Sequence, residues 1–201
     1  MNYDEFFTYI PTTIEKYEKI KLYINLLTKW NAKINLISKN DITIIWQRHI
    51  LDSAQLFKLI LPNDNIVDIG SGNGMPAIIL AILGVHNITL IETREKRTIF
   101  LQHAIGALGL KNAIVINDRV ENLSLETDVI ISRAFKDLVT TFDVCSNIKV
   151  NNKLLLLKGE NVDTEILQAK QKWQFSHQKI PSIVNENSCI LEIKGIKRLN
   201  T

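Results

Sequence analysis

The chain has 201 residues, of which 46% are hydrophobic, and a formal net charge of +3 at pH 7. This length suits one domain, or one domain with a helical extension, and the weak positive charge permits a nucleic-acid partner without requiring one. No apolar run approaches the ~18–20 residues of a membrane-spanning helix, and the N-terminus lacks the basic segment of a signal peptide. Cys145 and Cys189 fit no metal or redox motif, so we expect a cytoplasmic protein without a bound metal.

The first 62 residues have a helical pattern. Apolar side chains recur three or four positions apart from Tyr17 to Trp30, which predicts a helix with one buried face. Thr12 or Thr13 is a suitable N-cap for this helix. A polar connection over 31–40 and a second helix over about 41–61 complete an expected N-terminal helical cap, residues 1–62.

From residue 63 to 201 the pattern becomes that of an α/β domain, because short apolar runs alternate with longer amphipathic ones. The expected strands are Ile66–Ile69, Ile88–Ile91, Ala113–Ile116, Val129–Ser132 and Leu154–Leu157. The expected helices are Ala77–Leu83, Arg94–Leu108, roughly Lys136–Ile148 and Asp163–Trp173. Two further strands, Gln178–Val184 and Cys189–Lys194, would close a mostly parallel sheet with an antiparallel hairpin.

A glycine-rich turn follows the first expected strand, with Gly70, Gly72 and Gly74 at alternate positions. Such a turn at the carboxyl end of a strand is where an α/β sheet binds its ligand. Met75 stands where a dinucleotide motif would have its third glycine, and a carboxylate at Asp68 would repel a pyrophosphate. The turn therefore favours a cationic ligand, and S-adenosyl-L-methionine fits because it carries an ammonium and a sulfonium but no phosphate.

A second acid, Glu92, ends the second expected strand about twenty residues later, where a carboxylate can accept hydrogen bonds from ribose hydroxyls. Asp118 or Glu121, after the third strand, would lie near an adenine edge. The competing interpretation is that the glycines only form a tight turn and the acids are solvated loop charges. Acids at the ends of two neighbouring strands make that interpretation the weaker one.

Several longer motifs resemble one family across nearly the whole chain. They include Lys29-Trp30-Asn31, Arg48-His49-Ile50-Leu51-Asp52-Ser53, the stretch from Asp68 to Pro76, Ser132-Arg133-Ala134 and Leu157-Lys158-Gly159. In content and order they resemble the bacterial small-subunit ribosomal RNA methyltransferase G family, also called glucose-inhibited division protein B. The resemblance implies a Rossmann-like class I methyltransferase that moves a methyl group from S-adenosyl-L-methionine to N7 of guanine 527 in 16S rRNA, releasing S-adenosyl-L-homocysteine.

Carried over by position, the resemblance also implies the residues of the site. The expected cofactor-binding residues are Asp68, Gly70, Gly72, Met75, Glu92, Val120, Glu121 and Arg133. Independently of the resemblance, charge and an expected place beyond the strand ends make Arg119, Arg133 and Lys158 the candidate RNA-binding residues, with a solvated surface charge as the alternative for each.

Guanine N7 carries a free lone pair, so its methylation needs no general base, and proximity alone is the expected mechanism. We therefore assign no catalytic residue, with Arg133 the single candidate, and interpret His49 and Asp52 as a packing pair in the cap. The expected partner is 16S rRNA within the small ribosomal subunit or its precursor, bound by a monomer. A methyltransferase acting on a small molecule or protein, and a non-catalytic assembly factor, remain as alternatives.

Overall fold

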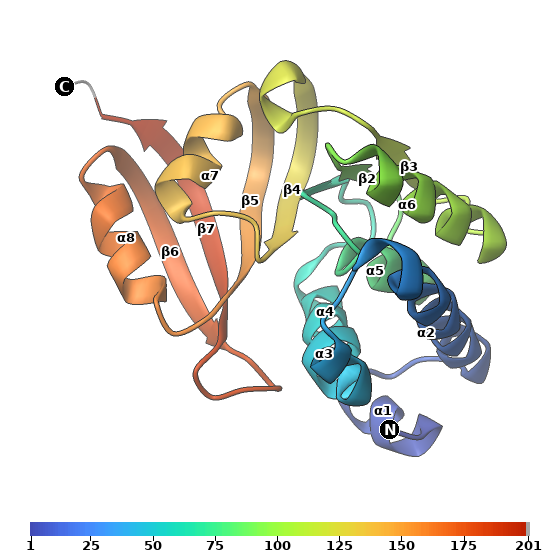
Figure 1. Ribbon diagram of the computed structural model, residues 1–201. Helices are drawn as coiled ribbons and strands as arrows, with labels where there is room; N and C mark the ends of the chain where they lie inside the picture. The colour runs from blue at the N-terminus through green and yellow to red at the C-terminus, as the bar shows by residue number, and fades with distance from the viewer. Residues whose placement is uncertain (200–201) are drawn as a thin grey trace.

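The computed structural model, which describes residues 1–199, contains one seven-stranded sheet (Figure 1). The strands are β1 (Ile66–Ile69), β2 (Ile88–Ile91), β3 (Ala113–Ile116), β4 (Leu125–Arg133), β5 (Ile148–Lys158), β6 (Trp173–Pro181) and β7 (Cys189–Arg198). Their spatial order is β3-β2-β1-β4-β5-β7-β6. The first five strands are parallel, and β7 lies antiparallel between β5 and β6. The predicted α/β class, with a mostly parallel sheet and a closing hairpin, is confirmed.

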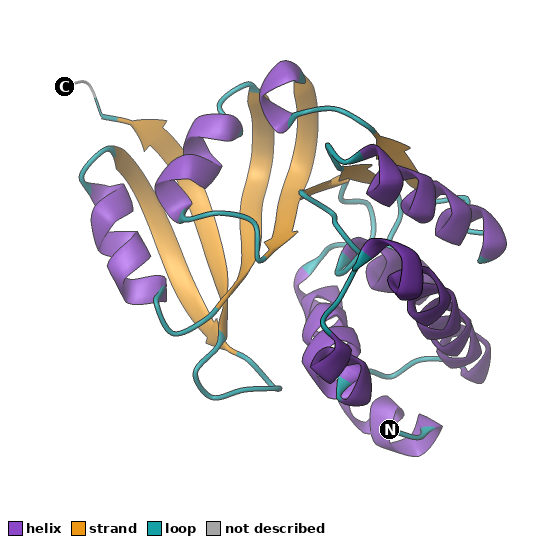
Figure 2. Ribbon diagram, viewed as in Figure 1, coloured by secondary structure: helices purple, strands orange, loops and turns teal. Residues whose placement is uncertain are grey.

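Helices cover both faces of this sheet (Figure 2). The four helices that follow strands are α5 (Ala77–Leu83), α6 (Glu95–Ala107), α7 (Leu138–Val144) and α8 (Val162–Lys170). Side chains alternate across each strand, so Ile66 packs into the hydrophobic cluster that contains α5 and α6, whereas Val67 and Ile69 pack into the one that contains α7 and α8. Asp68 lies on the same face of β1 as Ile66.

The cap is helical, but its second half is irregular. It consists of α1 (Tyr3–Tyr9), α2 (Ile14–Ile34), α3 (Lys39–Thr43), a π-helical segment (Trp46–Leu51), α4 (Asp52–Ala54) and a 3₁₀ turn (Gln55–Leu59). Thr13 caps α2 as predicted, since its hydroxyl accepts from the Lys16 N–H. The single predicted helix over 41–61 is wrong. Ser38 caps an earlier start, and the β-branched run 42–45 disfavours continuation.

The predicted bounds of β1, β2, β3 and α5 match the structure, while β4, β5 and β7 are longer than predicted. β6 is displaced from the predicted Gln178–Val184 to Trp173–Pro181, and the helix predicted to end at Trp173 ends at Lys170 as α8. The pairing extends into polar segments, such as residues 149–153 of β5, that carry no apolar pattern. The predicted helix over 136–148 is instead α7, which is shorter because Asp137 caps it at Leu138.

The cap shares its core with the sheet. Buried side chains from the cap, including Phe6, Tyr23 and Leu56, belong to the same hydrophobic cluster as Ile66 and Leu155 of the sheet. The boundary at residue 62 remains a prediction about domains, but the packing across it is continuous. Within residues 1–199, no helix combines the length and apolar character needed to cross a bilayer.

Candidate functional site

The glycine turn connects β1 to α5, and its backbone requires glycine. Gly70, Gly72 and Gly74 have φ values of +68°, +54° and +90°, which side-chain-bearing residues rarely adopt. A Cβ on Gly70 would lie 2.4 Å from Cδ2 of Phe135. One on Gly74 would lie 2.5 Å from Cδ1 of Ile78. Phe135 and Ile78 thus pack closely against the turn and leave no room for a side chain at Gly70 or Gly74.

The two predicted acids lie beside this turn. The Glu92 carboxylate accepts the Gly72 N–H at 2.8 Å and the Arg94 N–H at 2.8 Å, and the Arg97 guanidinium lies 3.9 Å away. Asp68 is buried, and its Oδ2 has no hydrogen-bond partner among the described residues. Burial raises the pKa of Asp68 to about 8, and the nearby Glu92 charge adds to the shift. An unpaired buried carboxylate is costly unless a ligand supplies a donor or a positive charge.

The remaining predicted cofactor residues lie along the same edge of the sheet. Met75 is buried at the end of the turn, next to the start of α5. Val120 is buried in a 3₁₀ turn that follows β3, whereas Glu121 of the same turn is exposed. This turn lies at the carboxyl end of the parallel strands, as Gly70 and Glu92 do.

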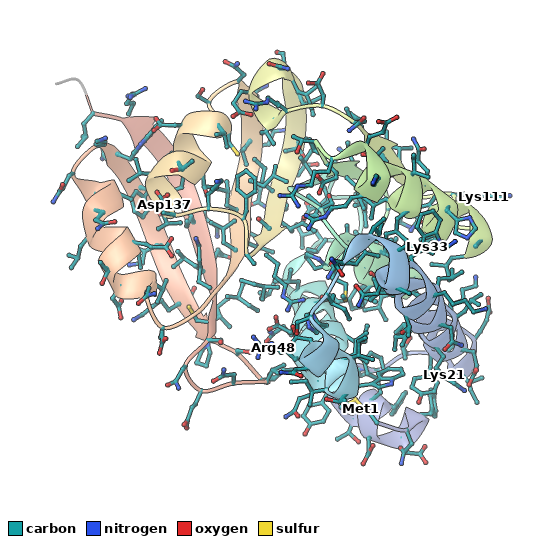
Figure 3. The ribbon with its side chains drawn as sticks, viewed as in Figure 1. Met1, Lys21, Lys33, Arg48, Lys111 and Asp137 are labelled. Carbon is teal, nitrogen blue, oxygen red and sulfur yellow. The ribbon has the colours of Figure 1, made fainter. Side chains whose placement is uncertain are left out.

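A cleft of about 850 Å³ opens next to the turn, between the cap and the ends of β4 and β5. Its walls include Arg48 and Asp52 of the cap, Arg133 and Phe135 after β4, and Lys158 at the end of β5. The loop 184–188 between β6 and β7 forms the far wall, and Figure 3 shows Arg48 on the side of the cap that faces this loop. Phe135 both lines the cleft and packs on Gly70, so it separates the cleft from the glycine turn.

Arg133 joins the sheet to the cap. Its Nη1 lies 2.7 Å from Nδ1 of His49, and its Nε lies 3.3 Å from Oδ2 of Asp52. Burial lowers the pKa of His49 to about 4, and the Arg133 charge adds to this effect, so the imidazole is neutral at pH 7 and Nδ1 can accept from Arg133. The expected His49–Asp52 packing pair is therefore bridged by Arg133.

The other two predicted RNA-binding cations differ in their surroundings. Lys158 lines the cleft, but its ammonium donates to Glu165 Oε2 at 2.7 Å and to the Lys136 carbonyl at 2.8 Å. Arg119 is exposed before the 3₁₀ turn and does not line the cleft. Arg133 and Lys158 thus share one cavity, and Arg119 stands apart from them.

Comparison with known proteins identifies the family. The sequence profile described as rRNA small subunit methyltransferase G matches residues 16–191. The chain belongs to this family. Ribosomal RNA small subunit methyltransferase G of Rickettsia massiliae is 42% identical over 183 residues, which cover 90% of this chain and 94% of the relative. The Rickettsia prowazekii protein of the same name is also 42% identical over 183 residues, covering 95% of that relative.

Solved structures agree on the fold. A SAM-dependent methyltransferase from Aquifex aeolicus superposes with a TM-score of 0.59 at 12% identity, covering 77% of this chain and 95% of that one. M. jannaschii TYW2 in complex with AdoMet superposes with a TM-score of 0.55 at 17% identity, covering 84% of this chain and 80% of that one. This member of the methyltransferase G family is therefore an rRNA methyltransferase with a Rossmann-like class I fold that uses S-adenosyl-L-methionine.

The residues around the glycine turn suit S-adenosyl-L-methionine as the ligand. Asp68 has one carboxylate oxygen, Oδ2, without a partner among the described residues, and Glu92 has carboxylate oxygens at the end of β2. The open backbone of the glycine turn allows close approach. No group of three or more metal-ligating His, Cys, Asp or Glu side chains occurs within residues 1–199.

Sequence reasoning missed three residues that shape the site. Tyr23 of α2 donates from its hydroxyl to the Asn73 carbonyl in the glycine turn, although its spacing indicated only a core residue. The need of a buried tyrosine hydroxyl for a partner was the available signal. Asp52 was assigned to packing but also lines the cleft, and Phe135 follows the Ser-Arg-Ala motif without any signal of its own.

Proposed function

We propose that this chain transfers a methyl group from S-adenosyl-L-methionine to N7 of guanine 527 in 16S rRNA. The observation that carries the proposal is the position of the cleft. It borders the carboxyl ends of β4 and β5, and Phe135 lies between it and the glycine turn at the carboxyl end of β1. An acceptor in the cleft would therefore be one aromatic side chain away from a ligand on the turn. Cations from the cap and the sheet line the same cleft, which suits a phosphate-bearing substrate.

The chemistry requires alignment and no proton transfer. The bound cofactor supplies an electrophilic methyl group on a sulfonium. The N7 lone pair forms the new N–C bond as the C–S bond breaks, and the positive charge passes from sulfur to the guanine ring. Because no proton leaves N7, the chain contributes by holding the base in line at near-attack distance. We accordingly assign no general base.

Roles for the cofactor-binding residues follow from their surroundings. Asp68 would neutralise the ammonium group, and Glu92 would accept from the ribose hydroxyls. The backbone at Gly70, Gly72 and Met75 would contact the methionine part. Val120 and Glu121, in the turn after β3, would contact the adenine.

Roles for the RNA-binding residues follow from charge and position. Arg133 and Lys158 would face the RNA within the cleft, and Arg119 would contact its backbone outside the cleft. The substrate would be 16S rRNA in the small subunit or its precursor, acted on by a monomer in the cytoplasm.

Mapping of N7-methylguanosine in 16S rRNA tests this function. Chemical cleavage at N7-methylguanosine should give a signal at position 527 in cells that carry the gene and none in cells that lack it. Restoring the gene should restore the signal. An unchanged signal would contradict the proposed reaction. Transfer of labelled methyl to an extract free of RNA would instead favour a small-molecule or protein substrate.

A further inference from the structure

Asp52 is a half-buried carboxylate in the wall of the cleft, and its position suits a contact with the substrate. It is the first residue of α4, its side chain is 16% exposed, and it lines the cleft. Two other carboxylates line the cavity, but Glu165 is neutralised by Lys158 and Glu186 is exposed on the loop between β6 and β7. Asp52 instead lies at the base of the cap, against the end of β4.

The Asp52 carboxylate is held in place yet keeps acceptor capacity. Its Oδ1 accepts from Nε2 of Gln55 at 2.8 Å, and its Oδ2 lies 3.3 Å from Nε of Arg133. An ionised carboxylate offers about four lone-pair sites, so roughly two remain for another donor. Within residues 1–199, the Nη2 of Arg133 has no hydrogen-bond partner. The Asp52 carboxylate therefore keeps lone pairs that can accept hydrogen bonds, and the neighbouring Nη2 of Arg133 keeps N–H groups that can donate them.

This pattern matches the Watson–Crick edge of guanine. That edge has an acceptor at O6 next to two donors, N1–H and the N2 amino group. Enzymes that act on an extruded base read it by hydrogen bonds to this edge. Adenine would place an amino group against the guanidinium and a ring nitrogen lone pair against the carboxylate. A base held by its Watson–Crick edge leaves N7, which lies on the Hoogsteen edge, free to react.

We propose that Asp52 is a specificity-determining residue that accepts N1–H and the N2 amino group of the target guanine, while Arg133 donates to O6. This assignment rests on the proposed function, since it places the target base in the cleft. It also explains why a half-buried ion pair lies at the cleft surface. Such a pair contributes little net stability over apolar packing.

Inosine at the target position isolates one of these hydrogen bonds, because inosine lacks only the N2 amino group. Small subunits carrying guanosine or inosine at position 527 are each methylated by the intact enzyme, and kcat/KM is compared. Loss of a hydrogen bond to a charged acceptor should slow the inosine substrate by about 10- to 100-fold. Equal rates on both substrates would overturn the role of Asp52 without any variant.

Asp52→Asn should lower the guanosine rate and bring the guanosine-to-inosine ratio toward one, with unchanged affinity for S-adenosyl-L-methionine. Asp41→Asn is the matched control. Asp41 is a cap carboxylate that pairs with Arg48 and lies 3.7 Å from His49, but it does not line the cleft. This control should keep the wild-type ratio.

Asp52→Asn protein that binds the cofactor and keeps the wild-type ratio would show that Asp52 serves only to hold Arg133. If the wild-type enzyme methylates neither substrate, the proposed function itself fails, and the assignment of Asp52 fails with it. The two failures are therefore distinguishable.

Discussion

The Tyr23 hydroxyl donates a hydrogen bond to the Asn73 carbonyl, which connects a helix of the cap to the glycine turn between β1 and α5. Tyr23 is fully buried, and the turn leads directly into α5. Nearer the start of α2, the Lys16 ammonium donates to the Leu83 carbonyl, the last residue of α5, at 2.6 Å. The cap helix α2 thus holds α5 at both of its ends.

Replacement of Tyr23 by Phe should weaken binding of S-adenosyl-L-methionine. It leaves the Asn73 carbonyl without its buried donor, so we expect a loss of about 1–2 kcal/mol in unfolding free energy. The cofactor dissociation constant, measured by calorimetry, should rise about fivefold or more, since ~1 kcal/mol corresponds to that factor. Lys16→Met removes the hydrogen bond from α2 to the Leu83 carbonyl at the far end of α5, and it should leave cofactor affinity unchanged. Equal affinity in Tyr23→Phe and wild type would disprove a positioning role for Tyr23.

Gly70→Ala and Gly109→Ala should differ sharply in cost. Both glycines have positive φ, +68° and +63°, so both substitutions carry backbone strain of about 1–2 kcal/mol. A Cβ on Gly109 meets nothing within 4 Å, whereas one on Gly70 meets Phe135. Overpacking adds about 1–3 kcal/mol, so Gly70→Ala should be the less stable variant in denaturant unfolding and should also bind the cofactor poorly. Similar unfolding free energies would argue against the contact with Phe135.

Asp68 should make both stability and cofactor affinity depend on pH. Its pKa is about 8 in the folded chain against 3.8 when unperturbed. The folded state therefore holds a proton that the unfolded state has lost, and this contribution to stability decreases as pH rises from about 4 to 8. A bound ammonium would favour the ionised carboxylate, so cofactor binding below pH 8 should release a proton.

Calorimetry in two buffers of different ionisation enthalpy measures that proton release directly. Asp68→Asn should abolish it and should flatten the dependence of unfolding free energy on pH between about 4 and 8. The same number of protons released by the wild type and by Asp68→Asn would assign the proton to another group.

Association with the small subunit should weaken as salt increases, and Arg119 should contribute to that dependence. If Arg119 contacts a phosphate, Arg119→Ala should reduce the slope of log K against log salt concentration by about 1. Lys149→Ala is a suitable control, because Lys149 lies near the start of β5, where the amino ends of the parallel strands lie, and pairs with Glu126. A slope reduced equally by both variants would indicate only a general effect of net charge.

The sequence was sufficient for the short strands β1, β2 and β3, whose bounds match the predicted ones. β1 and β2 are mostly apolar and buried, and acids or glycines mark their ends, so their bounds were predictable. The irregular cap was not predictable in this way. Its π-helical segment depends on how Ile50 and Leu51 pack against α5 and the sheet, and no local periodicity encodes that contact.

In the site, too, some features were predictable from the local sequence and others depend on tertiary contacts. Glycines and strand-end acids signal a cofactor turn through their own chemistry, wherever the rest of the chain lies. The contacts of Arg133 with His49 and Asp52 join residues more than eighty positions apart, so only the tertiary structure reveals them. Arg133, which was predicted to face RNA, connects the cap to the sheet in the structure, and its contact with RNA stays a prediction.

The shared core of cap and sheet has a consequence for synthesis of the chain. The cap is made first, but Phe6, Tyr23 and Leu56 are buried in a cluster that includes β1, α5 and α6. During translation these apolar side chains lack part of their covering layer until β4, β5 and β7, which also contribute to the cluster, have left the ribosome. Nascent chains that end before β7 should therefore bind chaperones and be cut readily by proteases, and protection should become complete only once β7 has emerged.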